Sequence, residues 1–266
     1  MSDNDVNSQP ISESEARIRA AIIKDIFSNM SEIVSGTFVM GSIGGFFFSE
    51  LGRSVDEVQH KVTISQNFMI AQHPVTQAQW MAVMGYNPSE FEGHDHPVEN
   101  VSWDEANVFC EKLNQIYAEV LPDNYKFTLP TEAQWEYACR AGTETALNTK
   151  ESLTNSKGVC YNLDVAGWYK KNSFRHTHPV GEKYPGCYYG LYDMHGNVWE
   201  WCRDWYGPYR GDAIDPVGPA TGTQRVVRGG CWDSEPEDCR SARRFYRYPD
   251  IKSSQVGFRL ALAPIA

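Results

Sequence analysis

The chain has 266 residues, 41% of them hydrophobic and 22% charged, which is enough to bury a core in one large domain or two small ones. Its formal net charge of −10 argues against nucleic acid as the main partner, because phosphate binding needs a basic surface. The sequence contains no run of about 18 apolar residues, so we expect no transmembrane segment.

Residues 1–30 are expected to form an N-terminal tail followed by one amphipathic helix. The first residues are polar and acidic and lack the apolar core of a secretory signal. Ser12 and Glu15 have the spacing of a capping box, and isoleucines follow at helical spacing, which predicts a helix over about 13–29. No repeat or break in composition divides residues 31–266, so we expect one domain there.

Strand-like and helical segments follow one another in the first half of this domain. Alternating apolar residues indicate short strands within 33–42 and 60–75. Further capping boxes, each predicting a helix, begin at Thr76, Ser102 and Thr131. The first and last of these helices are expected to stop at Gly85 and Gly142, because glycine adopts the left-handed conformation that closes a helix.

Residues 143–223 are rich in glycine, proline, asparagine and aromatic residues and are predicted to be mostly loop. Loops this long are uncommon in a compact domain and usually carry function or bind an ion that orders them. Closing strands are expected at 224–228 and 256–262. Between them the segment RRFYRY, residues 243–248, has neither a helical nor a strand period.

Seven ordered blocks between residues 33 and 262 resemble the formylglycine-generating-enzyme (sulfatase-modifying-factor) superfamily. They are GTFVMGS, HPVTQAQWMAVMG, HPVENVSWDEANVFCEKLN, FTLPTEAQWEYACRAG, GLYDMHGNVWEWCRDWY, RVVRGGCW and VGFRLAL. The resemblance implies an α+β chain with a variant C-type lectin fold: small antiparallel sheets, a few helices and much irregular loop. It leaves function open, because one fold carries many functions.

The enzymes of this superfamily resemble one another in a Cys-x-x-x-x-Cys pair shortly after an RGGS block. Here Ser234 stands where the first cysteine would be, and Cys231 and Cys239 are spaced differently. Copper-linked oxidation needs two soft thiolate ligands held together. We therefore expect no catalysis and no required cofactor, and a formylglycine-generating oxidase acting on a protein cysteine is the alternative. The seven cysteines have no zinc spacing and are expected to be mostly reduced, with a disulfide left open.

The C-terminal block resembles more closely the variable proteins of diversity-generating retroelements, which share this fold. Their block reads like RVLRGGSW, then template positions, CRSANR, PD and GFRL, and this chain has RVVRGGCWDSEPEDCRSARRFYRYPDIKSSQVGFRL. The resemblance implies a non-catalytic, receptor-type protein with a variable region at about 225–262. The frame that it implies to be scaffold comprises Arg228, Gly229, Gly230, Trp232, Cys239, Arg240, Ser241, Ala242, Arg244, Pro249, Asp250, Gly257 and Phe258.

The positions between these frame residues are expected to contact the ligand. They are Asp233, Ser234, Glu235, Asp238, Arg243, Phe245, Tyr246, Arg247, Tyr248, Ile251, Ser253, Ser254 and Gln255. In that family, mutation of adenines in AAC codons yields codons that end in a pyrimidine, a rule that all of them obey except Glu235 and Gln255. Rigid aromatics with arginine, serine and aspartate are the composition of antibody-type paratopes. The alternative is that Phe245, Tyr246 and Tyr248 are core aromatics.

The segment DMHGNVWEW contains a possible structural calcium site. Asp193 and Glu200 would supply carboxylates, and Gly196 and Val198 would supply carbonyl oxygens, all hard donors suited to calcium. The matching positions of the superfamily's enzymes resemble such a site. The alternative is that Glu200 only accepts hydrogen bonds while tryptophans pin the loop in the core. The lectin motifs Glu-Pro-Asn and Gln-Pro-Asp are absent from the sequence, so sugar binding through calcium is not expected.

Two His-x-His pairs, His94 with His96 and His176 with His178, could suggest a metal site, but such alternate histidines in loops are expected to be hydrogen-bonded or surface residues. The expected partner of the chain is a macromolecule, most simply a protein on another surface, and we expect the chain to be a monomer. Because such variable proteins are generally displayed outside the cell, we expect a cell-surface or secreted location, with the cytoplasm left open.

Overall fold

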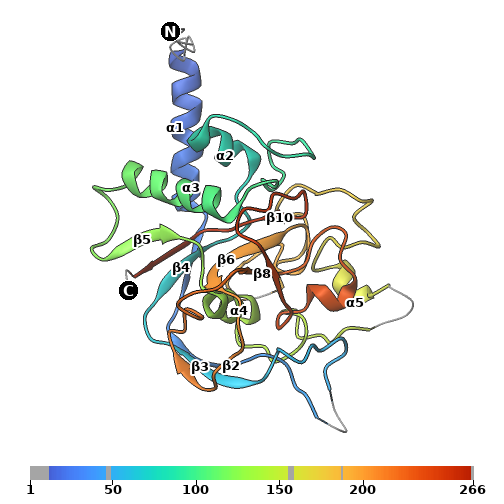
Figure 1. The fold of residues 1–266 in the computed structure, drawn as a ribbon. Coiled ribbons are helices and arrows are strands. Elements are labelled where there is room, and N and C mark those ends of the chain that lie inside the picture. Colours follow the sequence, from blue (N-terminus) through green and yellow to red (C-terminus); the bar gives the residue numbers. More distant parts are fainter. Residues whose placement is uncertain (1–11, 46–48, 155–158, 187, 265–266) are drawn as a thin grey trace.

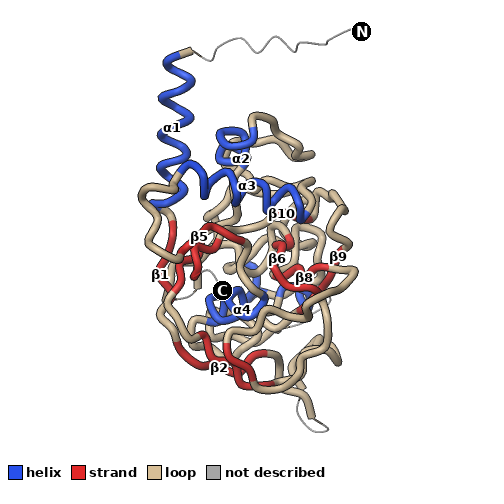
Figure 2. The backbone as a smooth tube through the Cα atoms, turned by 60° about the vertical axis from the view of Figure 1, so that its left-hand side comes forward, coloured by secondary structure: helices blue, strands red, loops and turns tan. Residues whose placement is uncertain are grey.

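The computed structural model describes residues 12–45, 49–154, 159–186 and 188–264. Over these residues short strands and helices are joined by long irregular segments, as expected for an α+β chain. Two large hydrophobic clusters and one small one fill the interior. Figure 2 shows how much of the backbone lies outside helices and strands. The interior is thus built largely from loops that pack against a few short elements.

The helices begin where the capping boxes predict them. They are α1 (Glu13–Ser28), α2 (Gln77–Met84), α3 (Trp103–Ile116), α4 (Glu132–Arg140) and α5 (Tyr161–Asp164), the last of which was not predicted. In the first four, both hydrogen bonds of the box are present. Helix α2 ends at Gly85, which has a φ of 86°, as predicted. Helix α4 ends earlier than predicted, because Ala141 already adopts the left-handed conformation before Gly142.

The strands form three small sheets in the described part of the chain. The first has the order β1 (Met30–Ile33), β4 (Phe68–Ala71), β11 (Ala261–Pro264) and β5 (Tyr125–Thr128). The second has the order β10 (Val256–Gly257), β6 (Trp199–Trp205), β8 (Arg225–Arg228) and β9 (Arg244–Arg247). The third has the order β2 (Gly36–Met40), β3 (His60–Ile64) and β7 (Ala213–Ile214). Most strand pairs are antiparallel, as expected, and β10 with β6 and β3 with β7 pair in parallel.

Strand β6 corrects the prediction that residues 143–223 are almost all loop. Its sequence, WEWCRDW, is buried on both faces over most of its length, including the charged Glu200 and Asp204. A strand that is buried on both sides has no apolar–polar alternation for sequence analysis to detect. This undetected strand lies inside the second sheet, between β10 and β8, and β9 follows β8 at the edge.

The C-terminal segment also differs from its prediction. The single closing strand expected at 256–262 is two strands, because the chain passes from the second sheet to the first between β10 and β11. The segment RRFYRY, which shows no sequence period, contains β9. That strand lies at the edge of the second sheet and pairs with β8 alone. Three of the proposed variable positions, Phe245, Tyr246 and Arg247, therefore lie on an edge strand with a regular backbone.

Helix α4 connects the second and third sheets, since it packs against β2, β3, β6 and β8. Figure 1 shows α4 between these strands and α1 projecting from the body beside α2. Ile26 is the one fully buried residue of α1, whereas Ile18 is 61% exposed. The helix therefore docks on the body through its C-terminal end.

Two further expectations concern membranes and cysteines. No helix in the described ranges has both the length and the apolar character needed to cross a bilayer. The six cysteines in the described residues are all buried, and no disulfide joins two of them, in agreement with the prediction of mostly reduced thiols. Cys187 lies outside the described residues.

Candidate ligand-binding face

Arginines of the C-terminal segment form buried ion pairs with distant parts of the chain. Arg228 lies 2.9 Å from Glu132 and 2.6 Å from Glu136, both on α4. Arg240 contacts Glu57 at 2.8 Å and Glu50 at 2.7 Å. Removing one partner of such a pair would leave a buried charge unpaired, at a cost of roughly 3–5 kcal/mol. These pairs clamp the C-terminal segment onto the body of the domain.

Two more arginines complete the clamp with two-point carboxylate bonds. Arg244 donates from Nε and Nη2 to the two oxygens of Glu132, at 2.6 and 2.8 Å. Arg259 donates in the same way to Glu200, at 2.6 and 2.7 Å. Paired hydrogen bonds of this kind fix orientation as well as distance. The frame is therefore held in place without any of the proposed variable side chains.

The glycines of RVVRGG let the chain turn tightly after β8. Gly229 and Gly230 have φ values of 98° and 79°, a region that side chains strongly disfavour. A Cβ atom on Gly230 would lie 2.6 Å from Sγ of Cys239. The turn thus needs glycine both for its backbone conformation and for the space beside Cys239.

On β9 the proposed variable side chains are stacked at the surface. The rings of Phe245 and Tyr246 lie 5.3 Å apart, and Phe245 also stacks on the ring of Trp199 at 5.5 Å. The guanidinium of Arg247 lies 4.5 Å from the Phe245 ring. Tyr246 is 37% exposed and Tyr248 is 55% exposed. The alternative that the aromatic run is a set of core residues is therefore wrong for the two tyrosines, while Phe245 is half-buried.

The remaining positions have mixed environments. Ile251 and Glu235 are exposed, and Asp233, Asp238, Arg243, Ser253, Ser254 and Gln255 are half-buried. Ser234 differs from its prediction as a surface contact, because it is 6% exposed and its Oγ accepts a hydrogen bond from the backbone N–H of Cys231. It supports the turn from inside.

Fixed residues hold the backbone of these positions. The indole of Trp232 donates to the carbonyl oxygen of Ser254 at 2.9 Å. The backbone N–H of Asn100 donates to the carbonyl oxygen of Ser253 at 3.0 Å. Two of the variable side chains also pair with each other, Arg243 with Asp238 at 2.9 Å. The backbone is thus held by bonds that do not depend on which side chains occupy Ser253 and Ser254.

Sequence analysis missed a loop that borders this face. The backbone N–H of Lys170 donates to the carbonyl oxygen of Ser234, and its Nζ lies 2.6 Å from the carboxylate of Glu235. The loop then exposes Phe174 to 81%, at a positive φ of 55°. Phe174 lies in the long segment predicted as loop, and only its position in space relates it to the variable region.

The arrangement of Cys231 and Cys239 does not match a pair of thiolate ligands. Both are buried, and burial raises the pKa of Cys231 to about 11 and raises that of Cys239 well above its ordinary value. Sγ of Cys231 accepts hydrogen bonds from the Asp233 N–H and the Ser234 hydroxyl. Both thiols are therefore protonated at neutral pH and lie in the packed interior.

The residues proposed for calcium do not fit that ion as they are arranged. Glu200 is neutralised by Arg259 and also accepts a hydrogen bond from the indole of Trp135 at 2.6 Å. Asp193 accepts from the Gly181 N–H at 2.8 Å, and burial raises its pKa to about 6. Within the described ranges no group of three or more acidic, histidine or cysteine side chains could hold a metal. The alternative interpretation, in which Glu200 only accepts hydrogen bonds, agrees better with these contacts.

His96, His176 and His178 are hydrogen-bonded and His94 is exposed, as expected. The ring of His178 stacks on Trp168 at 3.7 Å and lies 4.4 Å from that of His176. Nδ1 of His96 lies 2.9 Å from the hydroxyl oxygen of Thr177. Burial lowers the pKa of both His96 and His178, so these rings are mostly neutral near pH 7.

The chain is similar both to formylglycine-generating enzymes and to a variable protein of known structure. Residues 24–264 match the FGE-sulfatase family, the sulfatase-modifying factor enzyme 1-like domain. The formylglycine-generating enzyme of Bos taurus is 34% identical over 198 residues, or 71% of this chain. This chain spans only 50% of that enzyme's length. The solved structure of Treponema denticola variable protein 1 is 32% identical, with a TM-score of 0.76 over 88% of this chain and 95% of that one. PvdO from Pseudomonas aeruginosa, 23% identical with a TM-score of 0.74 over 88% of this chain and 93% of PvdO, shares the fold.

Proposed function

The chain belongs to the FGE-sulfatase family of sulfatase-modifying factor enzyme 1-like domains, and we propose that it is a non-catalytic member of that family. In this proposal it is a binding protein whose C-terminal region presents an exchangeable face. The chain has the C-type-lectin-like fold of this family and is similar to Treponema denticola variable protein 1 over most of both chains. Its ligand would be a macromolecule, most simply a protein on another surface, bound by a monomer at the cell surface or after secretion.

One observation carries this proposal: frame residues and proposed variable residues are interspersed in sequence, yet most frame residues are buried and most variable residues are not. The exceptions are Ser234, which is buried, and the frame residues Pro249 and Asp250, which are half-buried and exposed. Arg240 is completely buried in ion pairs, whereas its near neighbour Arg243 is half-buried and, within the described residues, forms an ion pair only with another variable residue, Asp238. Arg244 is 3% exposed, whereas Tyr246 is 37% exposed. A face organised in this way can change its contacts while the core stays the same, which is what a diversified binding protein requires.

The stacked rings support protein binding in particular. The ring of Tyr246 stacks on Phe245 and lies 4.5 Å from the tilted ring of Tyr206, so it is partly ordered before any ligand arrives. Pre-ordered aromatic side chains lose little entropy on binding and are the usual hot spots of protein interfaces. Arg243 and Arg247 beside them offer forked hydrogen bonds to partner carboxylates or carbonyl groups.

Diversification by a retroelement can be tested on the neighbouring DNA. We expect a near-copy of the codons for residues 231–262 that differs from them only at adenines and lies beside a reverse-transcriptase gene. Absence of such a copy from the genome would refute diversification, although the chain could still bind one ligand.

Binding by this face can be tested with a displayed library. The variable positions, except the buried Ser234, would be encoded by adenine-mutated AAC codons, displayed on yeast and sorted against lysozyme as a defined test protein. We expect binders with micromolar or better dissociation constants, the range of selected paratopes. A matched library that diversifies the exposed positions of 111–124 should give none. Equal success of the two libraries, or failure of the first, would contradict the proposed face.

A formylglycine-generating oxidase is the second candidate, favoured by the 34% identity to the bovine enzyme. The buried, protonated Cys231 and Cys239 weigh against it. Incubation with a cysteine-containing sulfatase peptide and copper under air, followed by mass spectrometry, separates the two candidates. We expect no aldehyde, and an aldehyde that disappears in the Cys239→Ser variant would favour the oxidase.

A further inference from the structure

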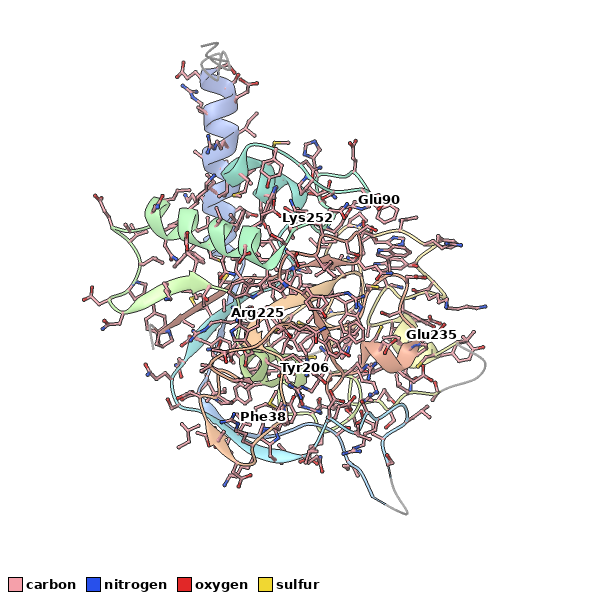
Figure 3. The ribbon with its side chains drawn as sticks, in the orientation of Figure 1. Phe38, Glu90, Tyr206, Arg225, Glu235 and Lys252 are labelled. Carbon is pink, nitrogen blue, oxygen red and sulfur yellow. The ribbon has the colours of Figure 1, made fainter. Side chains whose placement is uncertain are left out.

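Arg225 borders the proposed binding face without being one of its variable positions. It begins β8 and lies directly opposite Trp205 of β6 and Arg247 of β9. Side chains of paired residues in neighbouring strands project from the same face of the sheet, so Arg225 shares that face with the variable Arg247. Figure 3 labels Arg225 between Lys252 and Tyr206.

Two indole rings hold the guanidinium of Arg225. Its Cζ lies 3.6 Å from the ring centroid of Trp103 and 3.4 Å from that of Trp205. With both of its flat faces covered, the group can form hydrogen bonds only along its edge. Burial lowers the pKa of Arg225 to about 10, so it stays cationic at neutral pH. The charge is therefore held in one orientation before any partner binds.

The edge of Arg225 that could bind a carboxylate has no partner within the described ranges. Nη1 donates to the carbonyl oxygen of Arg203 at 2.7 Å. Nε is buried without a hydrogen bond, and Nη2 also has none but is not buried. Asp104 and Asp204 act on Arg225 through space, and neither forms an ion pair with it in this part of the chain. A buried donor without a partner calls for an explanation, because it costs about 1–3 kcal/mol.

The same protein shows what such an edge binds. Arg244 and Arg259 each use Nε and Nη2 together to hold both oxygens of a buried glutamate. In Arg225 the same two nitrogens have no hydrogen bond within the described ranges, and only Nε is a buried unpaired atom. A carboxylate that approaches Nη2 brings its second oxygen toward Nε, which would satisfy the unpaired donor.

We propose that Arg225 is a constant anchor of the binding face and takes an Asp or Glu carboxylate of the partner protein, whichever residues occupy the variable positions. This inference rests on the proposed function and deepens it. The variable side chains then select the partner, while Arg225 supplies one charge-assisted contact that all partners share.

The test uses N-acetyl-L-glutamate as the probe and the ¹⁵N-labelled full chain. We expect the indole N–H signals of Trp103 and Trp205, assigned with Trp→Phe variants, to shift and saturate with a dissociation constant on the order of 1–10 mM. N-acetyl-L-glutamine, which is neutral and almost the same shape, should leave them unmoved. Equal shifts from both probes, or shifts from inorganic phosphate but not from N-acetyl-L-glutamate, would overturn the proposal.

Variants decide which residue is responsible. Arg225→Gln should weaken binding at least about tenfold, and Arg225→Lys, which keeps the charge between the indoles but loses the fork, about fivefold. Lys24→Gln, which removes an exposed cation on α1 outside the proposed face, should keep the affinity within about threefold. If Arg225→Lys kept the wild-type affinity for N-acetyl-L-glutamate, the proposed role of Arg225 would be wrong, even if Arg225→Gln does not fold. Success of the yeast library without any effect at Arg225 would remove this inference alone, whereas failure of the library with carboxylate binding intact would remove the proposed function.

Discussion

Arg244 and Arg247 stand at the two ends of the same four-residue strand, and they have opposite environments. Arg244 is 3% exposed, bonds both oxygens of Glu132 and lies 3.8 Å from the ring of Tyr209. Arg247 is half-buried, packs over Phe245 and forms no ion pair within the described ranges. One strand therefore carries both a scaffold residue and contact residues, and the direction of each side chain sets its role.

The largest effect is expected from the buried end of the strand. Arg244→Ala would leave Glu132 with one guanidinium instead of two and would open space beside Tyr209. We expect the free energy of unfolding to fall by about 3–5 kcal/mol, measured by chemical denaturation. Arg247→Ala, the matched control on the same strand, should change it by less than about 0.5 kcal/mol. Similar losses at the two positions would contradict the division of roles.

The next effect depends on pH and concerns Asp204, which lies in β6 beneath Arg244. Asp204 and Glu132 line a cavity of about 200 Å³ with Tyr209 and Arg244. Oδ2 of Asp204 accepts a hydrogen bond from the Glu132 N–H at 2.9 Å. Burial, and then the neighbouring Glu132 charge, raise the pKa of Asp204 to about 7. The folded protein therefore keeps a proton that the unfolded chain has already lost above its ordinary pKa of about 4.

The sign of this effect follows from proton linkage. Between pH 4 and about 7 the folded state binds more protons at Asp204 than the unfolded state does, so stability contributed by this group is lost as pH rises. Asp204→Asn removes the ionisation and can keep the hydrogen bond from Glu132. We expect its stability relative to the wild type to grow by about 2–4 kcal/mol from pH 4 to pH 8, followed by thermal unfolding. A difference that does not vary with pH would show that Asp204 ionises normally.

A smaller effect is expected at the turn that positions the variable region. Gly230→Ala introduces a side chain at a φ of 79° and 2.6 Å from Sγ of Cys239. We expect a loss of about 1–3 kcal/mol in unfolding free energy. Gly85→Ala, which has a similar φ of 86° but meets no atom within 4 Å, measures the cost of the backbone conformation alone. Equal losses at Gly230 and Gly85 would show that the contact with Cys239 does not matter.

Much of the fold could be predicted from local patterns. A capping box needs only four residues, so the starts of α1, α2, α3 and α4 follow from sequence spacing. Strand β6 could not be found in this way, because it is buried on both sides and carries charges inside. Its charges are satisfied by residues far along the chain, such as Arg259 for Glu200, and no local pattern encodes such a pair.

The sequence predicts which positions belong to the binding face, but it does not predict which distant residues hold them in place. The alternation of frame and variable residues is a property of the sequence, but the partners of the frame are not: Glu57 binds Arg240 from 183 residues away. The contribution of Phe174 and of Arg225 depends on loops and strands that meet only in the folded chain. Ser234 shows the opposite error, because a position that is variable by sequence resemblance is buried here.

The smallest effect on the free energy of unfolding is expected from the exposed tyrosines of the variable region. Tyr246→Ser and Tyr248→Ser replace exposed rings by a residue that adenine mutation also permits, and neither tyrosine hydroxyl has a hydrogen-bond partner in the described ranges. We expect each variant to keep the wild-type unfolding free energy within about 0.5 kcal/mol, because little apolar surface is lost from the interior. Tyr206→Ser is the control, since Tyr206 is half-buried and bonds Asp56 at 2.6 Å. If Tyr246→Ser destabilised the fold as much as Tyr206→Ser, the ring would belong to the scaffold, and β9 could not exchange its contacts freely.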